Sequence, residues 1–508
     1  MNKRAMMVIS LALLTCLLSS CKVSRGQDNS TNNGKKSNSD QLIETWDDRT
    51  IFSSGLISTE QGTLKELPGA SVYHIDLEIS NALTSLTGTE TVQYTNRESQ
   101  ALDSIAFQLY PNQLGGKVDI SNVQVNGQST ETTYLDGNSA VMVALPQPLQ
   151  PNEKTLVKMD FSIDLPTTGG GNYGLFGYID GILVLDGFYP SIPVYDDLNW
   201  HAGPLPANAD TTFNDVSFYR VCVTAPADLV IVTSGTEIDR QKKGDQQVVT
   251  FAAGPARDFY MAASPDFVKV SKTIGETVVN SYAFSDFKKG AEVALNTSVE
   301  ALQDFDKRYG AYPYTEFDIV STPMQGATGI EYPGIIGINK LIYDPDTSLS
   351  GTPAFVMLEA TVAHEVGHQW FYNTVGNDQA NEPWVDESLT QYITSMYFLD
   401  EYGQNGKDLY TESWTSRWER VNKDATPIGL PAAEYQGAGY SAIIYGRGPI
   451  FLETLAESMG QSTFDAFLLD YAQKFHWQIS STTEFKSLAE IHCKCDLTGL
   501  FNEWIYSQ

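Results

Sequence analysis

The spacing of apolar residues changes along the chain, and this change limits the fold more than any other feature. From about Ser71, apolar and polar residues alternate in segments such as SVYHIDLEIS, SIAFQLY and VKMDFSIDL. Alternation with a period of two predicts half-buried β-strands. From about Ser285 the spacing becomes helical, first in FKKGAEVALNTSVEALQDFDKRYG. The sequence therefore predicts a multi-domain α+β protein with a β-rich part followed by a mainly helical part.

The predicted domain boundary follows this change. We expect an antiparallel β-sandwich over residues 65–284 and a mainly helical domain over residues 285–508. Pro353 and Pro383 stand near the starts of two predicted helices, where the missing N–H costs least. Further elements are expected at 317–323 (a strand) and at 352–373, 382–403, 449–459, 462–474 and 482–492 (helices).

The first residues have the layout of an export segment. Lys3 and Arg4 precede an apolar run from Ala5 to Leu18 that is short for a membrane span. The small residues before Cys21 resemble the lipobox of bacterial lipoproteins, in which the cysteine becomes the acylated first residue. We expect a lipoprotein signal peptide over 1–21, a lipid anchor on Cys21 and a location on the extracytoplasmic face of the cell membrane. The alternative is an ordinary signal peptide that ends near a cysteine.

A polar segment follows Cys21. It is rich in Ser, Asn, Gly, Lys and Asp to about Asp48, and such a composition cannot bury enough apolar surface to order itself. We therefore expect a flexible tether over residues 22–64.

The chain is strongly acidic. Its formal net charge is -30, from 32 Lys and Arg against 62 Asp and Glu. A field of this sign repels phosphate backbones, so nucleic-acid binding is not expected. It favours cationic groups such as peptide amino termini, although a solvated acidic surface explains the same charge.

The segment TVAHEVGHQWF, residues 361–371, contains the candidate metal ligands. His364 and His368 are four residues apart, so on a helix they lie on one face and can share a metal ion. Glu365 can reach a metal-bound water without being a ligand. A catalytic zinc commonly has three protein ligands, and Glu387, nineteen residues after His368, is the candidate third one. A glutamate near a helix start also has a simpler explanation in the helix dipole.

This ligand set indicates the metal and the chemistry. Two histidines and a glutamate favour one Zn²⁺ per chain, because magnesium and calcium prefer oxygen ligands. Iron stays an alternative, since it accepts the same ligand types. A glutamate beside the ligands favours hydrolysis, with Glu365 as general base and zinc lowering the pKa of its water to about 7.

Cys493 and Cys495 stand two residues apart beside His492. We interpret them as packed thiols or a local disulfide, with a metal site as the less favoured alternative.

Together these residues resemble the gluzincin zinc aminopeptidases of the aminopeptidase N and leukotriene hydrolase type. The shared signature is His-Glu-x-x-His followed, after eighteen residues, by Glu. The phrases YTN, LYPN and FYPSIPVYDD in the β-rich part are also similar. Over residues 65–508 the resemblance implies a saddle-like β-sandwich, then a thermolysin-like catalytic domain, with the active site between them. The family's large C-terminal helical domain is not matched, which implies a more open cleft.

Two further motifs carry roles that the resemblance implies. The segment GIEYPG, from Gly329, is similar to the family's Gly-x-Met-Glu-Asn strand, so Glu331 is expected to bind the substrate's free α-amino group, with Gly329 as a further substrate-binding residue. The segment YSAIIYGRG is similar to the family's Tyr-x-Lys-Gly segment. Tyr445 is therefore expected to stabilise the oxyanion, with Tyr440 as a second active-site tyrosine.

The chain departs from the family pattern at four positions, which leaves its substrate preference open. Ile330, Tyr332, Asp386 and Ser388 replace the family's Met, Asn, Asn and Gly. The second amine-binding residue of the β-rich part is not placed.

The sequence thus predicts a zinc metallopeptidase that acts on peptides, most specifically an aminopeptidase. The alternatives are an endopeptidase with the same metal centre and a non-catalytic surface lipoprotein that binds peptides. The oligomeric state stays open.

Overall fold

The structure is a computed structural model that describes residues 46–170, 173–196, 199–204, 206, 213–344, 346–349 and 351–506. The predicted signal peptide and Cys21 lie outside these residues. The described end of the predicted tether is packed: Arg49 donates to the carbonyl of Leu67, and Phe52 is buried within η1 (Thr50–Gly55). A flexible segment can therefore reach no further than about residue 48. Within the described part of the chain, the helices fall short of the length and hydropathy of a membrane span.

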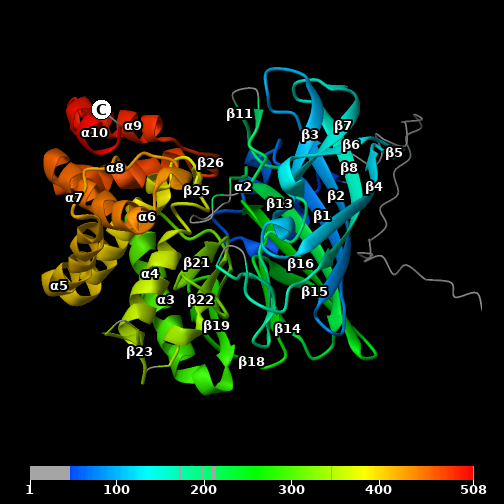
Figure 1. The fold of residues 1–508 in the computed structure, drawn as a ribbon, viewed down its shortest axis with the longest axis horizontal. Helices are drawn as coiled ribbons and strands as arrows, with labels where there is room; N and C mark the ends of the chain where they lie inside the picture. Colours follow the sequence, from blue (N-terminus) through cyan, green and yellow to red (C-terminus); the bar gives the residue numbers. More distant parts are fainter. Residues whose placement is uncertain are drawn as a thin grey trace, which may run out of the picture. The chain divides into compact units, whose positions relative to one another are not determined.

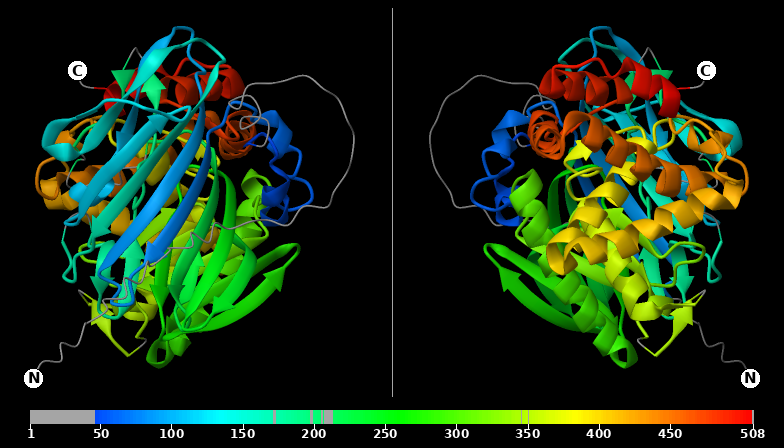
Figure 2. Two further views of the ribbon diagram at one scale, coloured as in Figure 1. Left: turned by 90° about the vertical axis from the view of Figure 1, so that its right-hand side faces the viewer. Right: turned by 90° about the vertical axis from the view of Figure 1, so that its left-hand side faces the viewer.

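An eight-stranded sheet dominates the first part of the chain (Figures 1 and 2). The predicted alternation is seen directly in β1 and β8, where buried and exposed residues alternate. Most neighbours are antiparallel as expected, but β1 pairs in parallel with β13. The strand order is β15 (Thr236–Lys243), β16 (Gln246–Ala256), β13 (Ser217–Pro226), β1 (Val72–Ile79), β2 (Ser85–Thr95), β8 (Lys154–Asp164), β4 (Lys117–Val125) and β5 (Gln128–Ser129).

Two smaller sheets share a core with the large one. Ile75 of β1, Phe107 of β3 and Leu183 of β10 belong to one buried cluster, so the sheets pack face to face as a sandwich. The predicted order of a β-sheet domain followed by a helical part is thus confirmed. The smaller sheets run β14 (Val230–Thr233), β17 (Met261–Ser264), β10 (Ile182–Leu185), β9 (Phe176–Ile179), and β3 (Leu102–Gln108), β7 (Ala140–Leu149), β6 (Thr132–Tyr134).

A mixed five-stranded sheet lies between the β-rich part and the helices in Figure 1. Its order is β18 (Phe267–Ile274), β19 (Thr277–Phe284), β20 (Glu316–Thr322), β22 (Ile335–Asn339) and β21 (Gly329–Tyr332). β19, β20 and β22 are mutually parallel, whereas β18 and β21 are antiparallel edge strands. β18 and β19 precede the predicted boundary at residues 284/285, so this sheet begins earlier than expected. The division into domains itself stays a prediction.

The helices follow the predicted ranges, with two clear differences. The helix predicted over 352–373 ends at Gly367, and the chain turns back at His368. In the next helix, Gly403 adopts a non-helical backbone with φ of 67° at the predicted stop, but helix continues beyond it. The main helices are α3 (Lys288–Tyr309), α4 (Ala354–Gly367), α5 (Leu389–Trp418), α6 (Gly439–Ala442), α7 (Gly448–Met459), α8 (Gln461–Lys474), α9 (Thr482–Cys493) and α10 (Thr498–Trp504).

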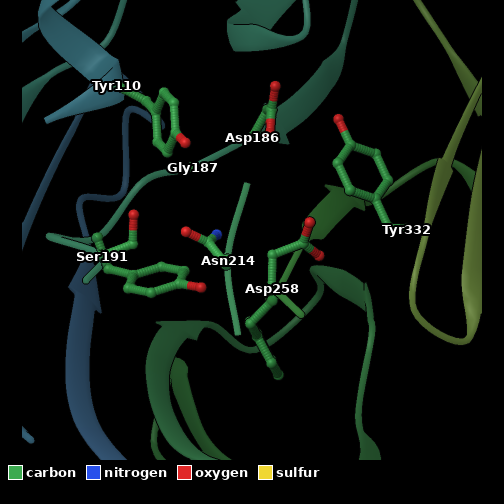
Figure 3. Close-up of a pocket in the computed structure, with 9 residues that line it drawn as sticks. Tyr110, Asp186, Gly187, Ser191, Asn214, Asp258 and Tyr332 are labelled. Atoms are coloured by element: carbon green, nitrogen blue, oxygen red, sulfur yellow. The ribbon is translucent and has the colours of Figure 1, made fainter. Parts of the chain in front are cut away.

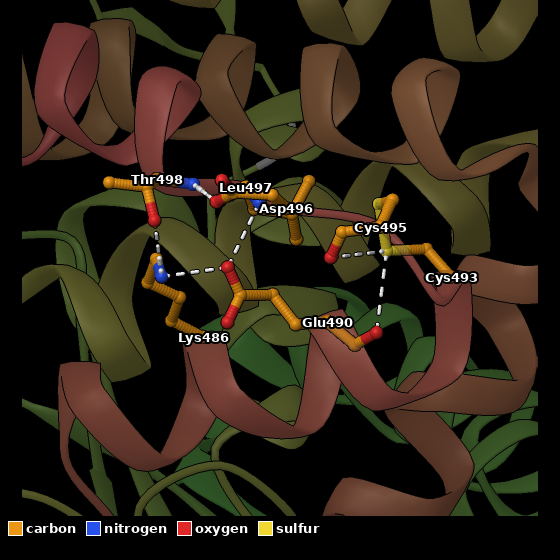
Figure 4. The surroundings of a disulfide bond; sticks show 7 residues. All are labelled: Lys486, Glu490, Cys493, Cys495, Asp496, Leu497 and Thr498. Carbon is orange, nitrogen blue, oxygen red and sulfur yellow. Dashed lines mark hydrogen bonds and ion pairs between the residues drawn. A yellow bond between two sulfur atoms is a disulfide. The ribbon is translucent and has the colours of Figure 1, made fainter.

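Cys493 and Cys495 form a disulfide at the end of α9 (Figure 4). The neighbouring His492 contacts Asp470 with 2.8 Å between Nε2 and Oδ2, away from the sulfur atoms. The local-disulfide interpretation therefore holds, and the metal alternative at these cysteines is wrong.

Candidate metal centre

The two histidines of the metal motif face each other at the end of α4. Their Nε2 atoms are 3.2 Å apart, and both side chains are buried. His368 is the first residue after the helix, and its Nδ1 lies 3.0 Å from the carbonyl oxygen of Phe371. A hydrogen bond from Nδ1 to this carbonyl leaves the Nε2 lone pair free for a metal ion. The end of the helix at Gly367 thus helps to fix the ligand's orientation.

Glu387 completes a three-ligand cluster. Its Oε2 lies 3.2 Å from His364 Nε2 and 3.4 Å from His368 Nε2. One ligand atom from each residue falls within 4.8 Å of the others, and all three residues are buried. Glu387 lies in a π-helical turn, η6 (Trp384–Ser388), which directly precedes α5. Such turns occur often at functional sites. The predicted third ligand is therefore in place beside the first two.

Close packing of α4 on α5 allows this approach. A Cβ added to Gly367 would lie 2.9 Å from both Thr390 Cγ2 and Ile393 Cδ1, closer than real Cβ contacts. Thr390 and Gln391 also contact the imidazoles, with 3.3 Å from Thr390 Oγ1 to His368 Nδ1 and 3.4 Å from Gln391 Nε2 to His364 Nδ1. The sequence analysis missed these two residues. The spacing of four residues from Glu387 to Gln391 would have indicated a shared helix face.

Negative charge is concentrated around the histidines. Burial, with Glu331 nearby, raises the pKa of Glu365 well above its ordinary value. Burial also raises the pKa of Glu331 to about 7, although His368 opposes the shift. Burial alone would lower the pKa of His368, but Glu331 and Glu387 raise it well above its usual range. Carboxylates crowded away from water favour a bound cation, which would offset their charge.

The cluster has the donor set of a zinc site. Burial lowers the pKa of His364 to about 4, so its imidazole is neutral and available as a ligand at neutral pH. Although burial opposes it, contact with both imidazoles holds the pKa of Glu387 well below its ordinary value. Two imidazoles and one carboxylate supply three ligands and leave a fourth position open for water. His364, His368 and Glu387 therefore fit a catalytic zinc.

Strand β21 brings the remaining predicted residues to the same place. Glu331 is buried, and Gly329 lies so close to Glu365 that an added Cβ would overlap Glu365 Oε1. Because successive side chains of a strand point to opposite faces, Tyr332 points away from the histidines. It lines a separate cavity of about 10 Å³. Figure 3 shows Tyr332 at this cavity with Asp186 and Asp258. Gly329 and Glu331 thus belong to the metal side, and Tyr332 does not.

Tyr445 contacts the third ligand of the cluster. It lies in a second π-helical turn, η9 (Ile443–Arg447), and its hydroxyl donates to Glu387 Oε1. The turn is tied to η6 by the hydroxyl of Ser388, which donates to the carbonyl of Ile444 at 2.6 Å. Tyr440 is buried next to Tyr445, with 5.9 Å between the ring centres. Both predicted tyrosines therefore lie at the cluster, although their roles stay predictions.

The amino-acid sequence is similar to those of known aminopeptidases. The model of the peptidase family M1 domain matches residues 293–504. Human endoplasmic reticulum aminopeptidase 2 is 23% identical over 395 residues, which are 73% of this chain and 39% of that protein. Aminopeptidase N of Canis lupus familiaris is 23% identical over 435 residues, which are 78% of this chain and 42% of that protein. The chain thus spans about two fifths of the length of these relatives.

Solved structures show the same fold. An M1 zinc metallopeptidase from Deinococcus radiodurans superposes with a TM-score of 0.63 at 20% identity, covering 83% of this chain and 91% of that one. A two-domain M1 zinc metallopeptidase bound to L-arginine gives a TM-score of 0.65 at 19% identity, covering 86% and 95%. The predicted family resemblance and fold class are confirmed. These relatives are described as aminopeptidases and zinc metallopeptidases, which agrees with the predicted zinc ion and the predicted class of peptide-bond hydrolases.

Proposed function

We propose that the chain is a zinc-dependent aminopeptidase of peptidase family M1, the gluzincin aminopeptidase family, whose domain model matches residues 293–504. It would remove residues from the free amino termini of peptides. The observation that carries the proposal is the buried cluster of His364, His368 and Glu387, with Glu365 and Glu331 beside it.

His364, His368 and Glu387 would hold the zinc ion. When bound, zinc lowers the pKa of a water molecule and polarises the scissile carbonyl. Glu365 accepts the proton of the attacking water as general base, and its raised pKa suits it to pass that proton on to the leaving amine.

Tyr445 and Glu331 supply the two other contacts that the reaction needs. The Tyr445 hydroxyl donates a hydrogen bond where negative charge develops on the substrate oxygen. Glu331, as a buried carboxylate, pairs with the substrate's α-ammonium group. This pairing places the first peptide bond, rather than an internal one, over the metal centre.

An endopeptidase with the same centre is the competing function. A panel of aminoacyl fluorogenic substrates, each with its N-acetylated counterpart, separates the two. We expect cleavage only of the free amino termini, loss of cleavage with a zinc chelator, and recovery when Zn²⁺ is restored. Equal cleavage of the acetylated substrates would instead support the endopeptidase.

A non-catalytic peptide-binding protein is the second alternative. The Glu365→Gln variant tests this alternative, because the substitution removes the general base but keeps the shape of the side chain. We expect zinc content near that of the parent and a rate lowered by about 10²–10⁴. A parent protein that binds zinc without cleaving any substrate of the panel would favour the non-catalytic function.

We also propose that the enzyme is exported and anchored by lipid on Cys21, as the segment before Cys21 suggests. Metabolic labelling with palmitate tests this directly. The label and the membrane association should both be lost in Cys21→Ala, and an unlabelled parent would contradict the proposal.

A further inference from the structure

The side-chain amide of Gln379 joins two buried carboxylates beside the metal centre. Its Nε2 lies 2.9 Å from Glu331 Oε1 and 2.8 Å from Asp386 Oδ2. The exposed fractions of Gln379, Glu331 and Asp386 are 3%, 5% and 1%. An amide nitrogen carries two hydrogen atoms, so it can donate one to each carboxylate. A single side chain therefore satisfies an oxygen of both acids.

This bridge connects segments that are far apart in the sequence. Glu331 belongs to β21, Gln379 to the connection between α4 and η6, and Asp386 to η6 itself. The other oxygen of Asp386 accepts the backbone N–H of the metal ligand Glu387 at 2.8 Å. The amide thus links the strand with Glu331 to the turn with the third metal ligand.

The same place could be mistaken for a second metal site. Ligand atoms of Glu331, His368 and Asp386 also fall within 4.8 Å of one another. However, His368 directs Nδ1 to the carbonyl of Phe371, and its Nε2 faces His364 and Glu387, so its metal-binding nitrogen belongs to the first cluster. The amide nitrogen of Gln379 lies between the two carboxylates, where a cation would have to lie. The amide of Gln379, a neutral hydrogen-bond donor, therefore explains why the carboxylates of Glu331 and Asp386 lie close together.

We propose that Gln379 is a positioning residue of the amine-binding subsite, an inference that rests on the proposed aminopeptidase function. It fixes one oxygen of Glu331, so that the carboxylate keeps its direction toward the substrate's ammonium group. It also keeps Asp386 as a second carboxylate next to this subsite. Without the amide, the two acids repel each other and Glu331 turns away.

The loss of this bridge should affect binding more than chemistry. Glu331 contacts an ammonium group that keeps its charge throughout the reaction, so its interaction is similar in the ground state and the transition state. Removal of such an interaction raises KM and leaves kcat nearly unchanged. A hydrogen bond to a charged group contributes enough for a change of about 10- to 100-fold.

Gln379→Met tests the inference, because methionine has a similar length and no donor. Gln247→Met is the matched control: Gln247 is 4% exposed, and its amide donates to the carbonyls of Pro226 and Leu229 at 2.9 and 2.7 Å within the β-rich part. We expect KM for free amino termini to rise about 10- to 100-fold in Gln379→Met, with kcat within about threefold and zinc content unchanged. The control should match the parent in KM and kcat. Gln379→Asn, whose amide is too short to reach both acids, replaces Gln379→Met if that variant does not fold.

A double-mutant cycle distinguishes positioning from general destabilisation. If Gln379 acts through Glu331, Glu331→Ala combined with Gln379→Met should bind no more weakly than Glu331→Ala alone. Multiplied losses in the double variant would overturn the inference.

Calorimetry of L-leucinol, which has the free amine but no scissile carbonyl, and of its N-acetyl form supplies a readout that does not need turnover. We expect Gln379→Met to weaken binding of the free amine and not of the acetylated ligand. Unchanged amine binding overturns the inference, whatever the activity. The parent protein can also fail to cleave every aminoacyl substrate while Gln379→Met still weakens binding of the amine. That result supports the inference and contradicts the proposed function.

Discussion

A side chain on Gly329 would occupy the position of the Glu365 carboxylate. The edge strand β21 therefore packs directly on the helix α4, and the backbone of Gly329 forms one wall of the site. An added Cβ would also lie 2.5 Å from Thr361 Cγ2, one turn before Glu365 on the same helix. The smallest residue is needed here because the general base and the strand share the space.

The first prediction follows from this contact. Gly329→Ala should displace Glu365 and lower kcat about 10- to 100-fold, since a shift of about 1 Å in a reacting group has effects of this size. Zinc content should stay the same, because the three atoms nearest to the new methyl group belong to Glu365 and Thr361 rather than to a metal ligand. Steady-state kinetics and metal analysis measure both quantities. Gly499→Ala, whose Cβ would meet no atom within 4 Å, is the control, and equal kcat in the two variants would show that the contact is unimportant.

The second prediction concerns the hydroxyl of Tyr445. Tyr445→Phe should lower kcat by about 10²–10³ and leave KM nearly unchanged, because the donor is needed only as the oxyanion develops. Tyr134→Phe, at an exposed tyrosine in β6, should behave like the parent. A Tyr445→Phe variant with full kcat would exclude the assigned role.

The third prediction concerns the packing of α4 on α5. Gly367→Ala forces a methyl group against Thr390 and Ile393, and such overpacking typically costs about 1–3 kcal/mol of the free energy of unfolding. The separation of the helices should also weaken zinc binding, measured by competition with a chelator. Ile393→Val removes Ile393 Cδ1, so we expect it to restore part of both losses in the Gly367→Ala background. No restoration would mean that the loss has another origin.

The fourth prediction concerns pH and the cavity behind β21. Burial, with repulsion from Asp258, raises the pKa of Asp186 from 3.8 to about 7. The folded state therefore holds a proton that the unfolded state releases, and the free energy of unfolding falls as pH rises from about 4 to 7. An asparagine at this position cannot ionise, so Asp186→Asn should remove this fall in the free energy of unfolding.

Urea unfolding measures the difference in the free energy of unfolding between Asp186→Asn and the parent. We expect this difference to favour the variant by about 3 kcal/mol more at pH 8 than at pH 5. Asp103→Asn, at an exposed aspartate, is the control for the charge change itself. A gain that does not depend on pH would show that Asp186 does not carry a proton in the folded protein.

Much of the fold was accessible from the sequence because the relevant patterns are local. Alternation over residues such as Val157 to Leu165 is sufficient for a strand, and the ends of α7, α8 and α9 were predicted to within two residues. The helix with the histidines was predicted too long, because apolar spacing continues past Gly367. The chain turns back there through backbone bonds such as Asn373 N–H to the carbonyl of His368, at 3.0 Å.

The sequence by itself determined the metal cluster in outline. His364 and His368 face the same way because residues four apart share a helix face, and Glu387 follows within reach of a reversed chain. The tertiary structure decided what surrounds them: the wall at Gly329, the amide of Gln379 and the carboxylate of Asp386. Glu331 and Gln379 are 48 residues apart, and their contact depends on how an edge strand packs against a connecting segment. No periodicity encodes such a contact, because it arises from the packing of whole elements rather than from the geometry of one.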